Sequence, residues 1–403
     1  MNIKNSSFNK LQISLSAGSH FITDIYQSFI IGLIPVLTLK FDLSLFKVGL
    51  LTATSVIANS LFSPIFGYFS DRHGLKYYII AGPLFTSIFL SLIGILPNYY
   101  FILTFLFLGN LSIAAYHPAS AAIAGHFGGS KKGLVSSIIN FGGNFGNALG
   151  VLLIILIVEK LNMNLTPIAM IPGIIMVIVL FKLVPNTSFR NKTGNTLNFF
   201  EKIKKVNKIK MYLLFLIMFT VYSLYIMWIT LITYMPLYYT RANITLINVG
   251  TIMLFFGMLG GAGGLFSGFL FDRFKKGSLI IQIGFVLAAP IFFFTFRTTG
   301  LISIILFVTG GFFLISIQPV CIRMTQDLLP GNMSLASSLI LGFSPGIAAI
   351  TMIFLGKAAD IIGIVRLVNY ELILVILAVL ILISFPFIEK SLRVKKQFVS
   401  KLK

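Results

Sequence analysis

The feature that most constrains this chain is a series of long apolar runs separated by short polar gaps. A helix needs about 20 apolar residues to cross the hydrocarbon core of a bilayer. Uncharged runs of about that length or longer recur along the sequence: 48–70, 133–158, 161–181, 211–240, 242–271, 278–296, 298–322 and 328–356. A still longer run, 77–116, is broken at Pro97 and Asn98 and predicts two spans. With a first span near 11–39 and a last near 367–388, we expect an all-α membrane protein of twelve transmembrane helices.

The composition supports lipid as the solvent of this chain. Only 10% of its residues are charged, against about 25% in a soluble domain. The net charge of +21 raises the possibility of a nucleic-acid partner, but a nucleic-acid binder gathers its Lys and Arg on one exposed face of a folded domain. Here they occupy the gaps between apolar runs. We therefore expect an integral membrane protein embedded in the lipid bilayer, with no nucleic-acid partner.

The Lys and Arg residues favour one orientation in the membrane. Cytoplasmic loops carry an excess of positive residues, and the gaps on the side of the N-terminus hold most of them, above all the stretch 185–208 and the tail from Lys390. Both termini are therefore predicted to be cytoplasmic, in a multi-pass protein of the plasma membrane. The domains expected are an N-terminal six-helix bundle (1–184), a cytoplasmic linker (185–209), a C-terminal six-helix bundle (210–390) and a basic tail (391–403).

An internal repeat supports the division into two halves. The sequence G-Y-F-S-D-R begins at Gly67, and G-F-L-F-D-R begins at Gly268, an offset of 201 positions. The same offset relates further pairs without a gap: Pro35 and Pro236, Pro118 and Pro319, Glu159 and Asp360. A series of matches at one offset indicates duplication. We expect two pseudo-symmetric six-helix bundles.

Two motifs resemble known transporter sequences. The segment G-Y-F-S-D-R-H-G-L-K at 67–76 is similar to the signature G-x-x-x-D-R/K-x-G-R-R/K of the major facilitator superfamily, with Leu75 in place of a basic residue. The segment N-F-G-G-N-F-G-N-A-L-G at 140–150 resembles the Gly-rich motif of its antiporter branch, but lacks the Pro of that motif. The resemblance implies the major facilitator fold and transport by alternating access.

Within that superfamily the chain resembles the fosmidomycin resistance proteins, a group of bacterial drug exporters. The stretches that carry this resemblance are H-F-I-T-D-I-Y-Q-S from His20, Y-H-P-A-S from Tyr116, G-G-N-F-G from Gly142 and L-G-K-A-A-D from Leu355. They extend from the first span to the eleventh. The resemblance implies efflux and drug resistance.

The repeated loop after the second span of each half predicts a conformational latch. Glycines let two helices pack closely around a short turn, and an Asp there can cap a helix or pair with Arg. The residues assigned to the latch are Gly67, Asp71, Arg72, Gly74 and Lys76 in the first half, and Gly268, Asp272 and Arg273 in the second. The alternative is a solvated basic turn that only orients the protein.

The fifth span has two different faces. Asn140, Asn144 and Asn147 follow i, i+4, i+7, whereas Gly142, Gly146 and Gly150 form a stripe on roughly the opposite side. Small residues at this spacing allow close helix contact in lipid. We expect the glycines to pack on a partner helix and the asparagines to line the substrate cavity. The alternative is that these amides only bond neighbouring helices.

The first span carries a polar stripe of His20, Asp24 and Gln27 at i, i+4, i+7. A charge at mid-membrane costs about 2.5–3.5 kcal/mol on insertion scales, so such residues usually face a cavity and serve transport. Asp24 is the one acid that we expect at mid-membrane depth. We predict that it carries a coupling proton and that Gln27 lines the cavity. The alternative is a neutral Asp held by local hydrogen bonds.

Further polar residues in spans four, seven and ten are candidates for the same site. His117 joins Asp24 and His20 as a proton-coupling candidate, because imidazole titrates near neutral pH. Asn110 and Gln318, which is equivalent to His117, are cavity candidates, as are Tyr225, equivalent to Asp24, and Trp228. The alternatives are a buried neutral His and ordinary aromatic helix contacts.

These patterns predict a secondary active transporter that exports a small molecule or drug in exchange for protons. The P-loop pattern G-x-x-x-x-G-K-[ST] is absent from the sequence. An importer or facilitator of a metabolite is the alternative, and a membrane-embedded enzyme or receptor is a more remote one, because the 10 acidic residues and 4 His are scattered. We expect a monomer that is not an enzyme, with no cofactor and no metal.

Overall fold

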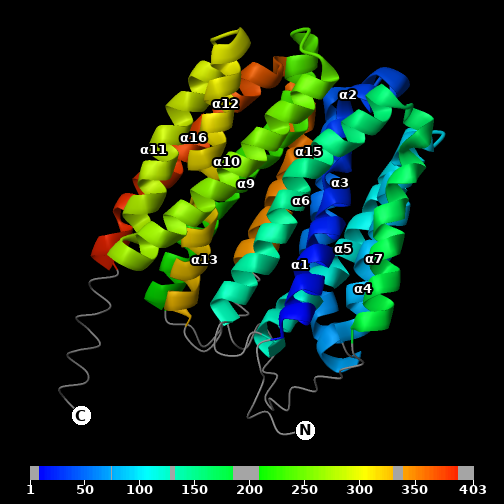
Figure 1. The fold of residues 1–403 in the computed structure, drawn as a ribbon. Coiled ribbons are helices and arrows are strands. Elements are labelled where there is room, and N and C mark those ends of the chain that lie inside the picture. The colour runs from blue at the N-terminus through cyan, green and yellow to red at the C-terminus, as the bar shows by residue number, and fades with distance from the viewer. Residues whose placement is uncertain (1–8, 74, 128–131, 185–207, 330–338, 389–403) are drawn as a thin grey trace, which may run out of the picture. The chain divides into compact units, whose positions relative to one another are not determined.

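The computed structural model describes residues 9–73, 75–127, 132–184, 208–329 and 339–388. Within these ranges the regular structure is helical, and they contain no strand. The elements, drawn in Figure 1, are α1 (Lys10–Gln27), α2 (Phe29–Phe41), α3 (Leu45–His73), α4 (Leu75–Ser91), η2 (Leu92–Ile95), α5 (Tyr99–Phe127), α6 (Lys132–Lys160), η3 (Met163–Ala169), α7 (Met170–Leu183), α9 (Lys208–Arg241), α10 (Leu246–Phe274), α11 (Gly277–Thr295), α12 (Gly300–Ile315), α13 (Ile317–Leu328), η4 (Leu339–Phe343), α15 (Ser344–Ile362) and α16 (Ile364–Ile383).

Twelve helical segments of the described chain are long and apolar enough to cross a membrane. Some combine two elements: α1 with α2, α4 with η2, η3 with α7, α12 with α13, and η4 with α15. The run predicted to contain two spans divides at Pro97 and Asn98, between η2 and α5. The expected number of spans is confirmed.

Three boundaries differ from the sequence prediction. The first span is interrupted at Ser28, whose N–H donates to Tyr26 and whose Oγ donates to the Ile25 carbonyl at 3.0 Å. The helix expected from 242 begins at Leu246, because Asn243 has a φ of 61° and ends the preceding helix. The eleventh span was expected from Leu328, but Leu328 is the last residue of α13; the span is described from Leu339, and 330–338 lie outside the described residues.

The described helices pack as two compact units. The first comprises residues 1–191, 229–258 and 349–364, and the second comprises 192–228, 259–348 and 365–403. The first unit therefore includes two stretches of the predicted C-terminal half, one from α9 and α10 and one from α15. The boundaries predicted at 184 and 210 stay a prediction, and the linker 185–207 lies outside the described residues.

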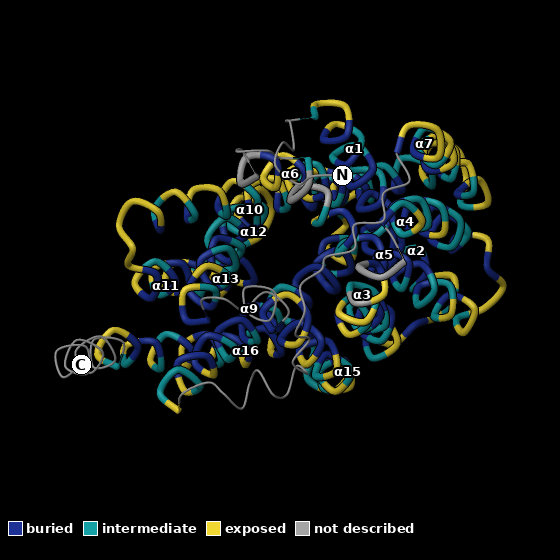
Figure 2. The backbone as a smooth tube through the Cα atoms, turned by 90° about the horizontal axis from the view of Figure 1, so that it is seen from below, coloured by how far each residue is buried: buried dark blue, intermediate teal, exposed yellow. Residues whose placement is uncertain are grey.

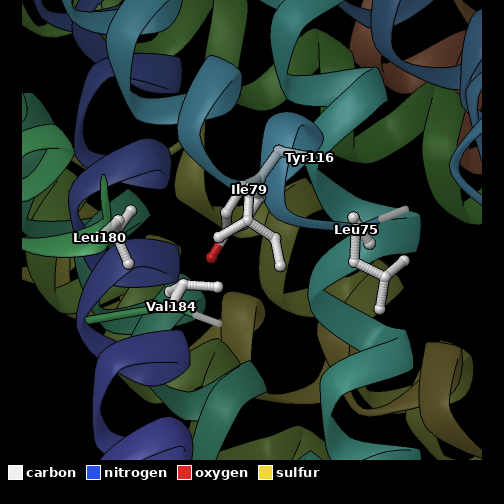
Figure 3. Close-up of a cluster of buried hydrophobic side chains, with 6 residues drawn as sticks. Leu75, Ile79, Tyr116, Leu180 and Val184 are labelled. Carbon is white, nitrogen blue, oxygen red and sulfur yellow. The ribbon is translucent and has the colours of Figure 1, made fainter. Parts of the chain in front are cut away.

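A cluster of buried apolar side chains holds α5 against α4 and α7 in the first unit (Figure 3). It consists of Leu75, Ile79, Tyr116, Ala119, Leu180 and Val184. The Tyr116 ring lies against the backbone of α4 at Gly82, where an added Cβ would lie 2.6 Å from Tyr116 Cβ. Because Tyr116 precedes His117, this packing also positions the imidazole of His117.

Exposed residues lie along one side of α7, where Figure 2 colours the backbone tube yellow, and several of them are large and apolar. On that helix they are Ile171, Ile174, Ile175, Ile178 and Phe181. Large apolar side chains at a spacing of three and four residues form a continuous stripe. An apolar exposed face is the arrangement expected of a helix that contacts lipid.

Candidate functional site

Two members of the polar stripe of α1, His20 and Asp24, are buried within the first unit. The hydroxyl groups beside them bond within the helix: Ser19 Oγ donates to the Ser16 carbonyl at 3.0 Å, and Thr23 Oγ1 donates to the Ser19 carbonyl at 2.8 Å. Such bonds satisfy a hydroxyl locally. They leave the imidazole of His20 and the carboxylate of Asp24 as the stripe's ionisable groups.

Asp24 lies between two imidazoles. Its Oδ2 is 3.3 Å from His20 Nε2, one helical turn away, and its Oδ1 is 3.9 Å from His117 Nε2 on α5. The Asp24 and His20 side chains are each 10% exposed, and that of His117 is 29% exposed. The structure therefore brings together all three predicted proton-coupling residues.

Tyr116, the residue before His117, connects α5 to α1 on the N-terminal side of His20. Ser19 Oγ and Tyr116 Oη are 2.6 Å apart, and Tyr116 Oη also donates to the Ser16 carbonyl at 3.3 Å. The His20 ring lies 5.1 Å from the His117 ring and 5.7 Å from the Tyr116 ring, measured between centroids. Buried hydrogen bonds of this kind fix the register of two helices. The hydrogen bonds of Tyr116 thus hold α5 against α1, and the rings of Tyr116 and His117 both pack against His20.

The glycines of α6 pack directly on α1, as the sequence predicted. A Cβ added to Gly142 would lie 2.6 Å from the Ala17 carbonyl oxygen. At Gly146 and Gly150, the added Cβ would meet the carbonyl oxygens of Phe21 and Ile25. Side chains larger than hydrogen would force the two backbones apart.

Gly143 is a site residue that the sequence analysis did not single out. An added Cβ there would lie 2.6 Å from His20 Nε2 and 2.7 Å from Asp24 Oδ2. The absent side chain therefore makes room for the His20–Asp24 pair. The sequence signal was the Gly142-Gly143 doublet, in which only the first glycine belongs to the stripe.

The predicted cavity residues of spans one and five are Gln27, Asn140, Asn144 and Asn147, and the structure leaves their side chains partly or fully exposed. Asn140 and Asn144 are exposed, and Asn147 and Gln27 are half-buried. Within the described residues, none of these side chains forms a hydrogen bond to a neighbouring helix. This observation disfavours the alternative in which the asparagines serve only to bond helices.

Asn110 of α5 is fully buried and bonds to its own helix. Its Nδ2 donates to the Leu106 carbonyl at 2.9 Å, while its Oδ1 has no hydrogen-bond partner among the described groups. A buried acceptor without a partner costs free energy. The Oδ1 of Asn110 is therefore an acceptor that a bound substrate could use, as expected of a cavity residue.

The equivalent positions of the second half also contact each other, in the second unit. Gln318 Nε2 donates to Tyr225 Oη at 2.7 Å, and the Tyr225 ring lies 5.8 Å from that of Trp228. All three predicted cavity residues of α9 and α13 therefore form one group. Its members are polar and aromatic but carry no charge near neutral pH.

The latch residues are described only in part. The side chains of Asp71 and Arg72, and the whole of Gly74, lie outside the described residues. Gly67 lies against Pro118, and Lys76 Nζ lies 5.3 Å from the centre of the Phe181 ring. The first latch remains a prediction.

In the second half, the predicted latch residues form local contacts. Asp272 Oδ1 pairs with Lys275 at 3.2 Å, both side chains being mostly exposed, and Arg273 lies over Phe274. Open space surrounds Gly268. The described contacts thus pair Asp272 with a neighbour in the same turn, where the sequence analysis had assigned it to a latch with Arg273.

A second buried carboxylate, Glu371, belongs to the last span. It is 2% exposed and lies near the start of α16 in the second unit. In the sequence it lies four residues into the predicted last span, 367–388, and was not among the predicted site residues. The emphasis on Asp24 as the one important membrane acid was therefore incomplete.

The cluster around Asp24 can exchange or share protons, since a carboxylate and an imidazole each bind one. The donor atoms of His20, Asp24 and His117 lie within 4.8 Å of one another. Histidine nitrogen and carboxylate oxygen also occur together in divalent-metal sites, whereas the sequence predicted no metal. Two cavities of about 400 and 690 Å³ elsewhere in the first unit are lined mainly by apolar side chains and include none of these residues.

Comparison with known proteins identifies relatives for most of the chain. The family model of the Major Facilitator Superfamily matches residues 17–340. The chain is 26% identical over 352 residues to the fosmidomycin resistance protein of Escherichia coli, covering 85% of this chain and 84% of that protein. It is 28% identical over 356 residues to the MFS-type transporter YfnC of Bacillus subtilis, covering 85% of each chain.

Two solved structures share the fold. A bacterial homologue of the human lysosomal transporter Spinster, in an inward-facing and unoccupied conformation, has a TM-score of 0.72 at 14% identity, covering 92% of this chain and 95% of its own. A mutant of the nucleoside transporter NupG has a TM-score of 0.75 at 13% identity, covering 94% of this chain and 100% of its own. At these identities the likeness concerns the fold alone.

Proposed function

The chain belongs to the Major Facilitator Superfamily, and on that premise we propose that it exports a small molecule in exchange for protons by alternating access. The relatives that cover most of the chain are a resistance protein and a transporter, not enzymes. The twelve predicted spans make it a multi-pass membrane protein. Within this frame, the coupling ion and the direction are the parts that we propose.

The observation that carries proton coupling is the position of Asp24. Its carboxylate is buried in a membrane-spanning helix, within 4 Å of two imidazole nitrogens. Ionisable groups inside a membrane span usually serve proton or substrate pathways. In our proposal Asp24 binds the coupling proton, and His20 and His117 deliver or accept it.

Export is supported by the relative that is named for resistance to fosmidomycin. The side chains that we propose for the substrate cavity are amides and aromatics, namely Gln27, Asn110, Asn140, Asn144, Asn147, Tyr225, Trp228 and Gln318. Such groups suit an uncharged, amphiphilic or cationic small molecule better than a strong anion. Uptake of a metabolite by the same fold is the competing direction.

The test uses purified protein in proteoliposomes. A thermal-shift screen of drugs and metabolites, fosmidomycin included, first identifies a ligand, and its flux is then measured under an imposed pH gradient of either sign. We expect the parent to move the ligand against the direction of the proton. Asp24→Asn should lose gradient-driven accumulation by at least roughly tenfold while ligand-for-ligand exchange persists, because an amide cannot release a proton.

Asp42→Asn is the matched control, because Asp42 is exposed and its carboxylate forms no hydrogen bond or ion pair within the described residues. Gradient-driven accumulation by Asp24→Asn at the rate of the parent would reject Asp24 as the coupling residue. Movement of ligand and proton in the same direction would instead identify an importer.

The proposed topology places both termini and the linker on the cytoplasmic side of the plasma membrane, in a monomer. In a Cys321→Ser background, a cysteine at Asn195 should react with an impermeant maleimide in inverted vesicles and not in intact cells. Labelling in intact cells would show that the proposed orientation is wrong.

The predicted first latch is tested in the same vesicles: well-folded Asp71→Asn should transport more slowly than the parent.

A further inference from the structure

The beginning of α3 receives a cap from a helix that is distant in the sequence. The first N–H groups of a helix have no partner within it. At α3, Ser44 accepts one of them, with its Oγ bonded to Lys47 N at 3.3 Å, and its carbonyl accepts the first bond of the helix, from Val48 N at 3.0 Å. The N–H groups of Leu45 and Phe46 instead donate to the carboxylate of Asp360, at 2.6 and 3.1 Å.

The position of Asp360 is unfavourable for its own helix. Asp360 lies in the last turn of α15 (Ser344–Ile362). The C-terminal end of a helix carries a partial negative charge and the N-terminal end a partial positive one. The carboxylate therefore opposes the dipole of α15 and is stabilised by that of α3. This contact explains an acid of the L-G-K-A-A-D segment that neither the proposed proton site nor the predicted latch uses.

A second bond and a close glycine contact lie beside this cap. The buried Tyr234 Oη, on α9, donates to the Leu45 carbonyl at 2.9 Å. A Cβ on Gly49 would lie 2.8 Å from that hydroxyl oxygen and 3.5 Å from the Cα of Gly356. The start of α3 is thus held to α9 and α15 by one carboxylate, one hydroxyl and a backbone contact between two glycines.

These contacts join the two sequence halves inside the first packing unit. Residues 229–258 and 349–364 belong to that unit together with α3. The start of α3 follows directly on the end of the first span. It therefore lies on the membrane face opposite Lys10, the face that we propose to be extracellular. A transporter that works by alternating access has to separate its halves on this face once in each cycle.

We propose that Asp360 is a positioning residue of the transport cycle, which closes the face opposite the termini by capping α3 and releases it when that face opens; this inference rests on the proposed alternating-access function. Water can take over the freed N–H groups of Leu45 and Phe46 in the open state. The cap therefore sets the balance between closed and open states and does not block opening.

The duplicated position lacks this cap. Glu159 of α6 is equivalent to Asp360, and Gly250 of α10 is equivalent to Gly49. A Cβ on Gly250 would lie 2.9 Å from Ile155 Cδ1, so the helices are close there as well. Within the described residues, however, the exposed carboxylate of Glu159 forms no hydrogen bond or ion pair. Glu159→Gln is therefore a matched control for Asp360→Asn.

The experiment measures opening directly. Thr52, 2% exposed, lies one turn beyond Gly49 on α3. Thr52→Cys in a Cys321→Ser background reports access from this face to an impermeant maleimide applied to intact cells. Removing a charge that interacts with a helix end should raise the labelling rate in Asp360→Asn by roughly three- to tenfold. Tyr234→Phe should raise it as well, Asp360→Glu should restore much of the parental rate, and Glu159→Gln should leave it unchanged.

Parental labelling rates in both Asp360→Asn and Tyr234→Phe, with each variant folded by thermal shift, would overturn the proposal. An equal increase in Glu159→Gln would overturn it too, because the effect would then not depend on the cap. The labelling readout needs neither substrate nor pH gradient. If Asp24 proved not to couple protons, the labelling rates would still test the cap at Asp360. If the labelling rates were parental, the flux experiment would still test Asp24.

Discussion

The same two positions carry different chemistry in the two halves of this transporter. In the first half, α1 and α5 place Asp24 beside His117, with 3.9 Å between the nearest oxygen and nitrogen. In the second half, α9 and α13 place Tyr225 beside Gln318, joined by a hydrogen bond of 2.7 Å. The third member of the first cluster, His20, corresponds to the buried Val221. The pairing of helices is retained, while groups that titrate near neutral pH occur at these positions only in the first half.

The helix packing behind the two pairs differs in the same way. Behind Asp24, the glycines of α6 bring its backbone against α1. The residues equivalent to Gly142, Gly146 and Gly150 are Phe343, Ile347 and Thr351, and Ser344 replaces Gly143. The first half thus combines close helix packing with groups that titrate near neutral pH, whereas the second half has larger residues at the glycine positions and a neutral pair.

The largest effect is expected at Gly143, where the second half has a serine. In Gly143→Ala the new methyl group would occupy space next to His20 Nε2 and Asp24 Oδ2. Overpacking of this kind costs about 1–3 kcal/mol, so gradient-driven transport should fall roughly 10- to 100-fold. Proteoliposome flux measures it, and thermal shift on the same sample separates lost coupling from lost folding. Transport at the rate of the parent would show that the pair tolerates displacement.

Next in size is the packing of α6 on α1. Gly146→Ala places a methyl group against the Phe21 carbonyl and should lower the free energy of unfolding by about 2 kcal/mol. Gly261→Ala in α10 is the control, because a Cβ there meets nothing within 4 Å. The control should be neutral or gain up to about 1 kcal/mol from helix propensity. Unfolding in mild detergent measures both, and equal stabilities would contradict close packing at Gly146.

A smaller effect should follow from giving the first half the second half's residue. His117→Gln retains a hydrogen-bonding side chain but cannot bind a proton near neutral pH. We expect gradient-driven transport to fall about tenfold, equivalent to 1.4 kcal/mol. Its dependence on pH should flatten across the range in which imidazole titrates. The measurement is the flux at a series of external pH values, with the internal pH changed in step so that the pH difference across the membrane stays constant. An unchanged pH profile would remove His117 from the proton path.

The smallest effect is expected in the neutral pair. Tyr225→Phe removes the acceptor of the Gln318 hydrogen bond and should weaken substrate binding by about threefold, as expected for one neutral bond of about 0.5–1.5 kcal/mol. The pH dependence of transport should not change. A titration of substrate concentration separates the two quantities. A shift in the pH profile of Tyr225→Phe would show that the second half also takes part in the pH dependence of transport.

Hydropathy was sufficient to locate most of the membrane helices, because the length and apolar content of a span are local properties of the sequence. The glycine stripe at Gly142, Gly146 and Gly150 also predicted its packing role correctly, since helical spacing places these residues on one face. The interruption at Ser28 was not predictable in the same way. Serine is compatible with a helix interior, and its own bonds to the preceding turn decide the break.

The contacts that the sequence did not reveal join residues from different helices. Gly143 stands out only once α6 is placed against the imidazole and carboxylate of α1. The bond between Asp360 and Leu45 links positions 315 residues apart. Spacing within a helix gives the direction of a side chain but not the identity of its partner. The proton-coupling cluster could be proposed because two of its members, His20 and Asp24, lie one turn apart on the same helix.

The neutral pair Tyr225–Gln318 also has an electrical consequence. Neither Tyr225 nor Gln318 titrates near neutral pH, so this pair contributes no exchangeable charge to balance the one at Asp24. Exchange of one proton for one uncharged molecule would then carry one elementary charge inward in every cycle. Each 100 mV of membrane potential is worth about 2.3 kcal/mol per elementary charge. Export of an uncharged molecule would therefore continue on the membrane voltage alone when the pH is equal on the two sides.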